Sequence, residues 1–298
     1  MKFDKINYIE RKTKELKTEN PPGEGFLKFL YYNPLGKLPL NLVVRKKFLT
    51  DFYGKKMSEA SSKEKIKPFV IENSINMNES KKNIEDFSSF NDFFIRELKE
   101  GSREIDTNSD ILVSPADGKI LVFNDLKETT KFFLKGDEFT VEEFLMDKNE
   151  AKKFEGGTIV IIRLAPVDYH RFHFPASGEI GESKLIDGYY YSVSPYAIKK
   201  NFRVYCENKR EVSILKTAEF GDIVLSEIGA TMVGGIKQTY NPGLIKKGDE
   251  KGYFFFGGSS CVLLFEKDRV QFDEDILENS RNGIETKVYM GERIGKAK

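Results

Sequence analysis

Two apolar runs separated by two glycines and two serines make up the segment Gly252-Tyr253-Phe254-Phe255-Phe256-Gly257-Gly258-Ser259-Ser260-Cys261-Val262-Leu263-Leu264-Phe265. The aromatic and aliphatic runs at its two ends have the length and the residue types of buried strands. Glycine inside such a run usually marks a bulge or a close backbone approach. A hydroxyl that directly follows a glycine carbonyl can also attack that carbonyl, because glycine has no Cβ to block the approach. This stretch alone therefore permits two interpretations, a β-bulge with a serine pair or a self-cleaving Gly258-Ser259 bond.

The rest of the chain divides into two parts of different character. After Gly101, short apolar segments alternate with Gly, Pro, Asn and Asp, which predicts a β-rich, sandwich or barrel-like core. Before it, periodic apolar residues predict helices. We therefore expect an α+β protein with a helical region over residues 1–85 and a β-rich catalytic domain over residues 86–298. The predicted helices are 7–18, 26–32, 42–53 and 90–98, and the predicted strands include 119–123, 158–164, 211–217, 222–228, 231–236 and 287–290.

Composition narrows the class of protein. The chain has 298 residues and two cysteines, Cys206 and Cys261, whose spacing fits neither a metal site nor a disulfide framework. A reducing compartment is the simplest expectation. No segment approaches eighteen uninterrupted apolar residues, so we expect no membrane-spanning helix.

Charge is unevenly distributed along the chain. Residues 1–56 contain thirteen Lys or Arg and six Asp or Glu, an excess of seven positive charges in a chain whose net charge is +1. Aromatic and aliphatic residues stand among these lysines, as in segments that bind anionic membrane surfaces. An amphipathic helix packed on its own domain has the same pattern, and that alternative stays open. We expect no nucleic-acid partner, because local acids offset the basic residues and no recognised motif is present.

Two further motifs carry groups suited to catalysis. Ser114-Pro115-Ala116-Asp117-Gly118 is a tight turn that presents a carboxylate, and such turns are often purely structural. Asp168-Tyr169-His170-Arg171-Phe172-His173-Phe174-Pro175 contains both histidines of the protein. Histidine moves protons near neutral pH, so this motif is a candidate acid–base site. A His-x-x-His metal pair is the alternative, but no further ligands stand nearby and we expect no metal.

These motifs together resemble the phosphatidylserine decarboxylase proenzymes of prokaryotes whose cleavage motif begins with a double glycine. The similarity extends from about Phe90 to the C-terminus and includes Phe93-Phe94-Ile95-Arg96-Glu97-Leu98-Lys99. The resemblance implies that Asp117, His173 and Ser259 form the self-processing triad and that His170 serves decarboxylation. It also implies cleavage after Gly258 and conversion of Ser259 into a covalent pyruvoyl cofactor, which forms a Schiff base with the substrate.

The resemblance extends to products and partners. It implies a large chain, residues 1–258, and a small chain, residues 259–298, that remain together as a heterodimer. Whether two heterodimers associate is left open. The implied reaction converts phosphatidylserine to phosphatidylethanolamine and CO₂ at the cytoplasmic side of the cell membrane, where the enzyme is peripheral. A soluble pyruvoyl-dependent amino-acid decarboxylase, a Ser-His-Asp hydrolase and a non-catalytic binding domain are the alternatives.

Overall fold

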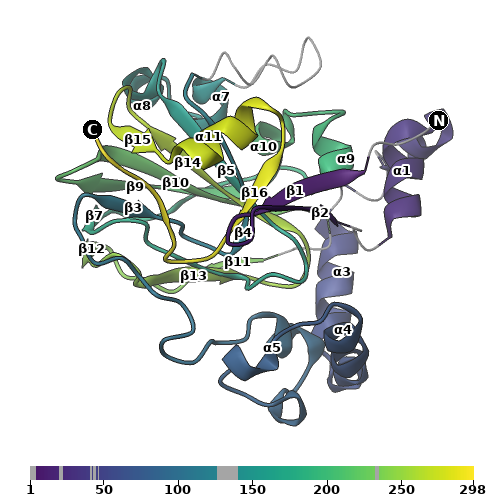
Figure 1. The fold of residues 1–298 in the computed structure, drawn as a ribbon. Helices are drawn as coiled ribbons and strands as arrows, with labels where there is room; N and C mark the ends of the chain where they lie inside the picture. Colours follow the sequence, from purple (N-terminus) through teal and green to yellow (C-terminus); the bar gives the residue numbers. More distant parts are fainter. Residues whose placement is uncertain are drawn as a thin grey trace.

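The computed structural model describes residues 5–19, 23–40, 42, 45, 47–125, 140–231 and 235–298. Through these residues runs an open, mixed sheet of eleven strands, with two sheets of three strands and several short helices around it (Figure 1). The strand order of the large sheet is β12-β7-β9-β10-β14-β5-β4-β16-β1-β2, and β8 pairs with β9 outside this path. Its strands span Gly243–Ile245 (β12), Gly178–Ile180 (β7), Lys184–Ile186 (β8), Arg210–Thr217 (β9), Gly221–Ile228 (β10), Ser259–Phe265 (β14), Thr158–Leu164 (β5), Gly118–Phe123 (β4), Glu285–Val288 (β16), Ile6–Glu10 (β1) and Glu15–Glu19 (β2).

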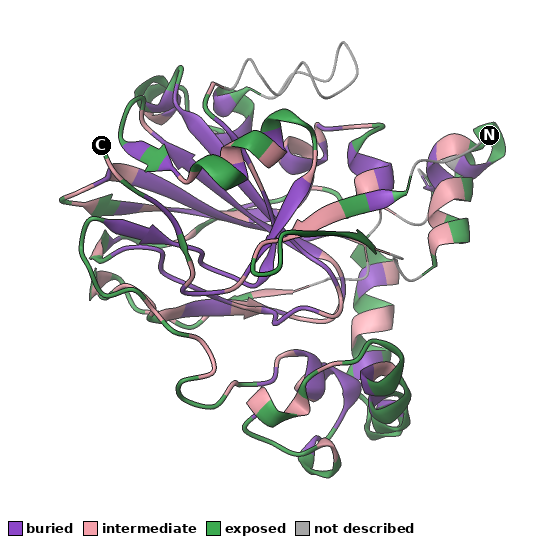
Figure 2. Ribbon diagram, viewed as in Figure 1, coloured by how far each residue is buried: buried purple, intermediate pink, exposed green. Residues whose placement is uncertain are grey.

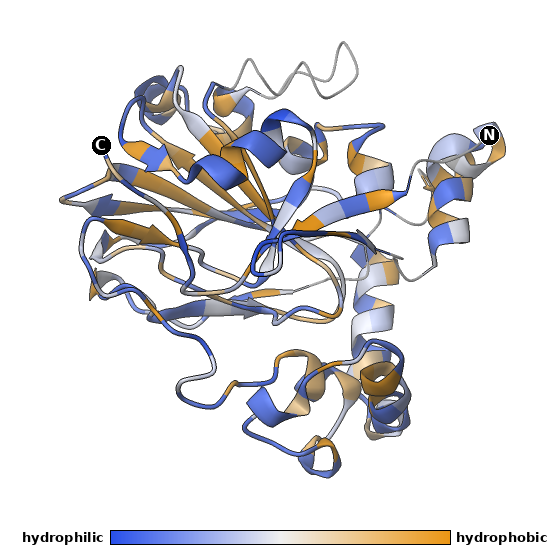
Figure 3. Ribbon diagram, in the orientation of Figure 1, coloured by the Kyte–Doolittle hydropathy of each residue, from blue (hydrophilic) through white to orange (hydrophobic). Residues whose placement is uncertain are grey.

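Strand β14 lies near the middle of this sheet, antiparallel to β10 on one side and to β5 on the other. All seven of its residues are buried. Because side chains alternate across a strand, Val262 and Leu264 enter one hydrophobic core while Leu263 and Phe265 enter another. Both faces of the sheet are thus covered here, which explains the unbroken apolar run in the sequence. Figure 2 shows these central strands as buried, and Figure 3 shows β10 and β14 as hydrophobic.

The two small sheets flank the large one. One has the order β11-β13-β6 and the other β15-β17-β3. The segment 255–258 joins β13 of a small sheet to β14 of the large sheet, and β13 pairs with β6, which contains His173. The cleavage motif and the histidine motif are therefore neighbours in the fold. The strands are Ile236–Gln238 (β11), Glu250–Phe254 (β13), Arg171–His173 (β6), Val270–Phe272 (β15), Arg293–Ala297 (β17) and Ile111–Val113 (β3).

Whereas the buried residues of α1 belong to a core of the large sheet, helices α3, α4 and α5 form a core of their own, drawn at the lower right of Figure 1. The aromatic residues Phe87, Phe90, Phe93 and Phe94 are buried there with Met57, Ile66 and Val70. Phe256, from the segment between β13 and β14, packs against this cluster. The helical elements of the N-terminal part are Glu24–Tyr32 (α1), Pro34–Gly36 (η1), Lys37–Pro39 (α2), Lys47–Ser58 (α3), Ala60–Lys65 (η3), Ile66–Glu72 (α4), Met77–Glu79 (η4), Ile84–Asp86 (η5) and Phe90–Phe94 (α5).

The remaining helices cover the large sheet. Helix α11 (Glu274–Arg281) packs on β4, and its Ser280 hydroxyl accepts a hydrogen bond from the Val122 amide at 3.0 Å. The others are Val141–Leu145 (α7), Lys148–Ala151 (α8), Lys152–Phe154 (η6), Pro195–Ile198 (α9) and Val204–Glu207 (α10). Within the described residues, no helix is long and apolar enough to cross a membrane.

The α+β class is confirmed, as is the strand over residues 158–164. The barrel-like closure is wrong, because the large sheet is open and ends at β12 and β2. The helix expected at residues 90–98 is shorter and ends at Phe94. Part of the strand expected at 231–236 lies outside the described residues.

The helix expected at residues 7–18 is also wrong, because these residues form the β1–β2 hairpin. Its turn places Lys14 at a φ of 59°, and the Lys14 amide donates to the Glu10 carbonyl at 2.7 Å. Strand β1 then pairs in parallel with β16. A partner strand about 275 residues away in the chain thus decides the conformation of a segment with little intrinsic preference.

Candidate active site

The Gly258-Ser259 bond lies where the chain passes from the small sheet into the large one. Gly257 has a φ of 134°, a conformation that a residue with a Cβ rarely adopts. A Cβ added to Gly258 would have open space around it, with Val193 the nearest group at 3.7 Å. Ser259 begins β14 and is fully buried. The peptide carbonyl and the following hydroxyl are thus held at the junction between flexible glycines and a rigid strand.

His170 is the side chain that contacts the Ser259 hydroxyl. Its Nδ1 lies 3.3 Å from Ser259 Oγ, and its Nε2 lies 2.9 Å from the Ala165 carbonyl oxygen. Because a carbonyl only accepts hydrogen bonds, Nε2 must carry the proton, which leaves the lone pair of Nδ1 facing the serine. The ring also stacks on Phe94 of α5, with centroids 4.0 Å apart. Burial lowers the pKa of His170 to about 3, so the ring is neutral and weakly basic.

Asp168 supports this histidine through the backbone. Its Oδ2 accepts a hydrogen bond from the Ala165 amide at 2.7 Å and thereby holds the turn whose carbonyl bonds to His170. Lys287 donates to the other carboxylate oxygen at 2.6 Å. Burial alone would raise the pKa of Asp168, but Lys119 and Lys287 hold it well below its usual range. The sequence motif includes Asp168, two residues before His170, yet its spacing alone does not reveal this role.

His173 lies apart from the serine in the contacts that the structure describes. Its Nδ1 is 3.1 Å from the Gly248 carbonyl and its Nε2 is 3.4 Å from the Tyr169 hydroxyl. Burial lowers the pKa of His173, while the Gly248 hydrogen bond and the charges of Glu250 and Asp117 oppose that shift. His173 therefore has carboxylates nearby that stabilise its protonated form.

Asp117 is held by Arg103. Arg103 donates from Nε and Nη2 to the two carboxylate oxygens at 3.0 and 2.6 Å, and the Met290 amide donates at 2.8 Å. Asp117 lies within electrostatic reach of His173, but among the described residues neither of them has a recorded contact with Ser259. The hydroxyl is paired with His170, a contact that sequence spacing did not predict.

A buried cluster of charges lies beside the cleavage site. Arg163, which pairs with Ser260 across β5 and β14, donates to Glu19 at 3.0 and 2.8 Å and to Glu285 at 2.9 and 2.6 Å. Lys119 is 3.0 Å from the same Glu19 carboxylate. Burial alone would raise the pKa of Glu19, but Arg163 and Lys119 lower it to about 2. This cluster fastens the end of the β1–β2 hairpin to the strands that carry the site.

A mostly apolar cavity of about 330 Å³ reaches the scissile peptide. It lies between helix α1 and the ends of the core strands. Its walls include Phe26, Leu27, Leu30 and Tyr31 of α1, residues 163–166, residues 192–194, and Phe256, Gly257 and Gly258. An apolar ligand in this cavity would reach both the N-terminal helices and the cleavage segment.

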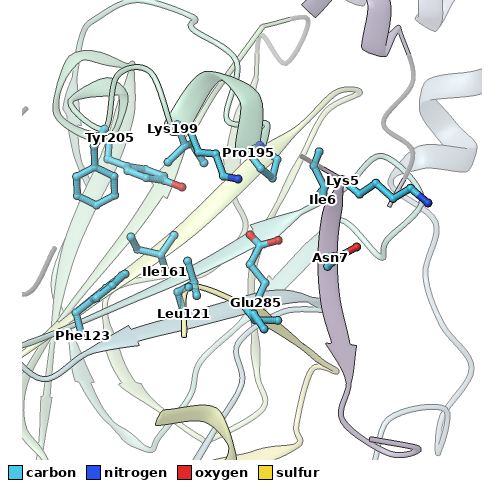
Figure 4. Close-up of a pocket in the computed structure, with 14 residues that line it drawn as sticks. Lys5, Ile6, Asn7, Leu121, Phe123, Ile161, Pro195, Lys199, Tyr205 and Glu285 are labelled. Atoms are coloured by element: carbon cyan, nitrogen blue, oxygen red, sulfur yellow. The ribbon is translucent and has the colours of Figure 1, made fainter. Parts of the chain in front are cut away.

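A second cavity of about 330 Å³ lies beside Glu285 (Figure 4). Leu121, Phe123 and Ile161 of the large sheet line it, with Tyr205 and Lys199 on the opposite side and Lys5 and Asn7 near its edge. Neither Gly257 nor Gly258 lines this cavity, so the α1 cavity is the one that serves the candidate site. Among the described residues, no group of three or more His, Cys, Asp or Glu is arranged to hold a metal ion.

A buried serine hydroxyl that faces a neutral imidazole, directly after a glycine carbonyl, can perform intramolecular acyl transfer. Residues 90–296 match the family model for phosphatidylserine decarboxylase. The chain belongs to the phosphatidylserine decarboxylase family.

Relatives named phosphatidylserine decarboxylase proenzyme match the chain over nearly its whole length. The protein from Fusobacterium nucleatum is 64% identical over all of both chains. The protein from Clostridium perfringens is 45% identical over 97% of this chain and 99% of its own length. The protein from Desulfitobacterium hafniense is 44% identical over 97% of this chain and 98% of its own. The similarity therefore includes the N-terminal helices that line the α1 cavity.

Proposed function

We propose that this chain is a pyruvoyl-dependent phosphatidylserine decarboxylase that cleaves itself between Gly258 and Ser259. The observation that carries the proposal is the Gly257-Gly258-Ser259 junction, where a buried serine hydroxyl directly follows the Gly258 carbonyl and Gly257 has a φ of 134°. Membership of a family whose relatives are named proenzymes supports self-processing. The products would be a large chain of residues 1–258 and a small chain of residues 259–298.

In the proposed cleavage, Ser259 Oγ attacks the Gly258 carbonyl carbon, and the peptide bond becomes an ester as the nitrogen leaves and takes a proton. Loss of the Ser259 α-proton then expels the Gly258 carboxylate. The resulting dehydroalanine becomes an imine, and water releases ammonia to leave an N-terminal pyruvoyl group. The pyruvoyl group draws electrons from the carbon that loses CO₂. The start of a buried strand is a suitable place for this group. The strand would fix its position, and the burial of the strand would keep water away from it.

We assign the two histidines different tasks. His173, with Asp117 nearby, is proposed to accept the Ser259 proton during cleavage, as the family resemblance implies. His170 is proposed to move a proton during decarboxylation, because its ring lies against the residue that becomes the pyruvoyl group. The low pKa of His170, about 3, supports this division, since so weak a base removes a proton from a serine hydroxyl poorly.

The two chains are proposed to stay together as a heterodimer after cleavage. Strand β14 of the small chain is hydrogen-bonded between β5 and β10 of the large chain, and its side chains enter both cores. The α4–α5 region holds the other new end, because Phe256 packs on Phe90 and Phe94. Separation of the chains would expose this apolar surface to water.

We propose that helices α1 to α4 hold the enzyme on the cytoplasmic face of the cell membrane. Most large apolar side chains that the structure leaves exposed belong to this region: Phe26, Phe29, Leu35, Leu38, Leu42, Phe48, Phe52 and Ile71. The excess of seven positive charges in residues 1–56 suits an anionic bilayer. The α1 cavity would admit a lipid from this surface to Gly258.

Mass spectrometry combined with a lipid assay tests the proposal. The purified protein is expected to contain two chains that divide after Gly258 and to release CO₂ from phosphatidylserine in vesicles. Activity on free serine alone would favour a soluble amino-acid decarboxylase. An intact chain with esterase activity would favour a hydrolase, and an intact, inactive chain would favour a binding domain.

A further inference from the structure

Arg96 is a buried cation for which the described residues supply no hydrogen-bonding or ion-pair partner. It follows helix α5, and its residue is 7% exposed. Among residues 5–19, 23–40, 42, 45, 47–125, 140–231 and 235–298, no side chain or carbonyl forms a hydrogen bond or an ion pair with its guanidinium. Its recorded contact is with the ring of Phe93, whose centroid lies 5.1 Å away.

Two other buried arginines, Arg163 and Arg210, and the partly buried Arg103 all have hydrogen-bonding partners. Arg163 is paired with Glu19 and Glu285, and Arg103 with Asp117 and Glu79. Arg210 donates to the backbone carbonyls of four residues, Glu143, Phe144, Cys206 and Asn208. Burial of a charge without compensation is strongly unfavourable. Within the described parts of the chain, Arg96 has only the ring of Phe93 and the more distant charges of Asp117 and Asp168, so an anionic ligand would supply the direct partner that the other arginines already have.

Arg96 lies close to the candidate site in the fold, although it does not line the α1 cavity. Helix α5, which ends two residues before it, supplies Phe94, whose ring stacks on His170. His170 in turn contacts Ser259. Burial lowers the pKa of Arg96, while the charges of Asp117 and Asp168 oppose that shift. The guanidinium also contributes to the low pKa of His170, which places the two groups within electrostatic reach of each other.

We propose that Arg96 binds the phosphodiester of the phosphatidylserine headgroup in the cleaved enzyme. This inference rests on the proposed function. The planar guanidinium matches a phosphate with two parallel hydrogen bonds. The substrate carboxylate is the less suitable partner, because its charge disperses as CO₂ leaves. A cation on that group would stabilise the ground state more than the transition state and would slow the reaction.

Cleavage provides the route to Arg96. In the intact chain Phe256 packs on Phe90 and Phe94, and the Phe256 amide donates to Asn91 Oδ1 at 3.0 Å. The segment 255–258 is tethered at both ends by β13 and β14. Breaking the bond after Gly258 frees one end, so the segment can move aside and open the α5 wall to the α1 cavity. Cleavage also creates a carboxylate at Gly258, which is a second possible anion for Arg96.

The test uses Arg96→Met and Arg96→Lys. Methionine keeps much of the side-chain volume of arginine but has no charge. Lysine keeps the positive charge but lacks the planar guanidinium that donates two parallel hydrogen bonds. The KM for phosphatidylserine in mixed micelles is expected to rise on the order of tenfold or more in Arg96→Met and by less in Arg96→Lys. We expect kcat to change less than KM, and cleavage to remain complete by intact mass.

Thermal unfolding separates ligand binding from a structural role. In the uncleaved Ser259→Ala background, Arg96→Met is expected to keep or raise Tm, because it removes an unpaired buried charge. Arg210→Met is the matched control. Arg210 is also buried, but its guanidinium already donates hydrogen bonds to backbone carbonyls, and these lie away from the site. Arg210→Met is expected to lower Tm. A lowered Tm for Arg96→Met, or its failure to cleave, would assign Arg96 to folding or maturation and overturn the proposal.

Two soluble headgroups identify the anion. Glycerophosphoserine carries a phosphodiester and a carboxylate, whereas glycerophosphoethanolamine carries the phosphodiester alone. Both compounds are expected to inhibit the wild-type enzyme. In Arg96→Met, inhibition by each compound is expected to become weaker by a similar factor. If only inhibition by glycerophosphoserine becomes weaker, Arg96 binds the carboxylate. If inhibition by neither compound becomes weaker, Arg96 pairs with the new Gly258 carboxylate or binds no ligand. Each of these last two results contradicts the proposal. An inactive wild type would instead refute the proposed function.

Discussion

Substituting the two histidines separately dissects the proposed chemistry. In His170→Asn the side-chain amide can still donate to the Ala165 carbonyl, which His170 Nε2 contacts at 2.9 Å, but the proton-transfer group beside Ser259 is lost. Positioned proton transfer contributes about 10²–10⁴-fold to a rate, or about 3–5 kcal/mol of barrier. We expect His170→Asn to mature fully and to lose about that factor in kcat. His173→Asn should instead cleave slower by a similar factor and accumulate as precursor.

A time course after expression provides the assay. Denaturing gels measure the fraction of precursor, and release of labelled CO₂ from phosphatidylserine vesicles measures turnover of the cleaved fraction. The reasoning is refuted if His170→Asn remains uncleaved while His173→Asn matures. That result would give the cleavage step to the ring that the structure places 3.3 Å from Ser259 and would remove His173 from the triad.

The N-terminal part gives two further predictions. Glu19→Gln leaves Arg163 and Lys119 short of an anion, and the shift of the Glu19 pKa to about 2 corresponds to about 3 kcal/mol of unfolding free energy at neutral pH. The wild type loses this contribution as pH falls from about 4.5 towards 2. Its free energy of unfolding, measured with urea, should therefore approach that of Glu19→Gln in this pH range. A difference between the two proteins that stays the same at every pH would contradict this. Phe48→Ser with Phe52→Ser should reduce flotation with phosphatidylserine vesicles, including at high salt, whereas Leu244→Ser, a change at a still more exposed apolar residue on β12, should not. Equal flotation of all three proteins would show that α3 does not bind the membrane.

The sequence predicts the central strands well because their signal is local. Strand β14 combines apolar residues with glycines before it, and both faces are buried, so its pattern identifies it without knowledge of its neighbours. Residues 7–18 lack such a signal. Their charged and isolated apolar residues suit a helix or a hairpin, and pairing with β16 decides between them.

The candidate site was only partly predictable for a similar reason. Ser259, His170, His173 and Asp117 were identifiable by residue type and by motif, but the contact of the serine with His170 depends on how the turn at Ala165 folds back. Arg96 lies in the segment 93–99, and its residue type and position alone assign it no role. Its lack of a hydrogen-bonding partner among the described residues is a property of three-dimensional packing, and no spacing rule in the sequence reveals it.

The central claim is that the Gly258-Ser259 bond breaks and Ser259 becomes a pyruvoyl group. Intact-mass analysis of the purified wild type and of Ser259→Ala tests it most directly. We expect chains of residues 1–258 and 259–298 in the wild type, with the small chain lighter by the mass that separates a serine from a pyruvoyl group. Ser259→Ala should remain a single chain. A wild type that remains one chain yet decarboxylates phosphatidylserine, or a Ser259→Ala protein that is cleaved and active, would contradict it.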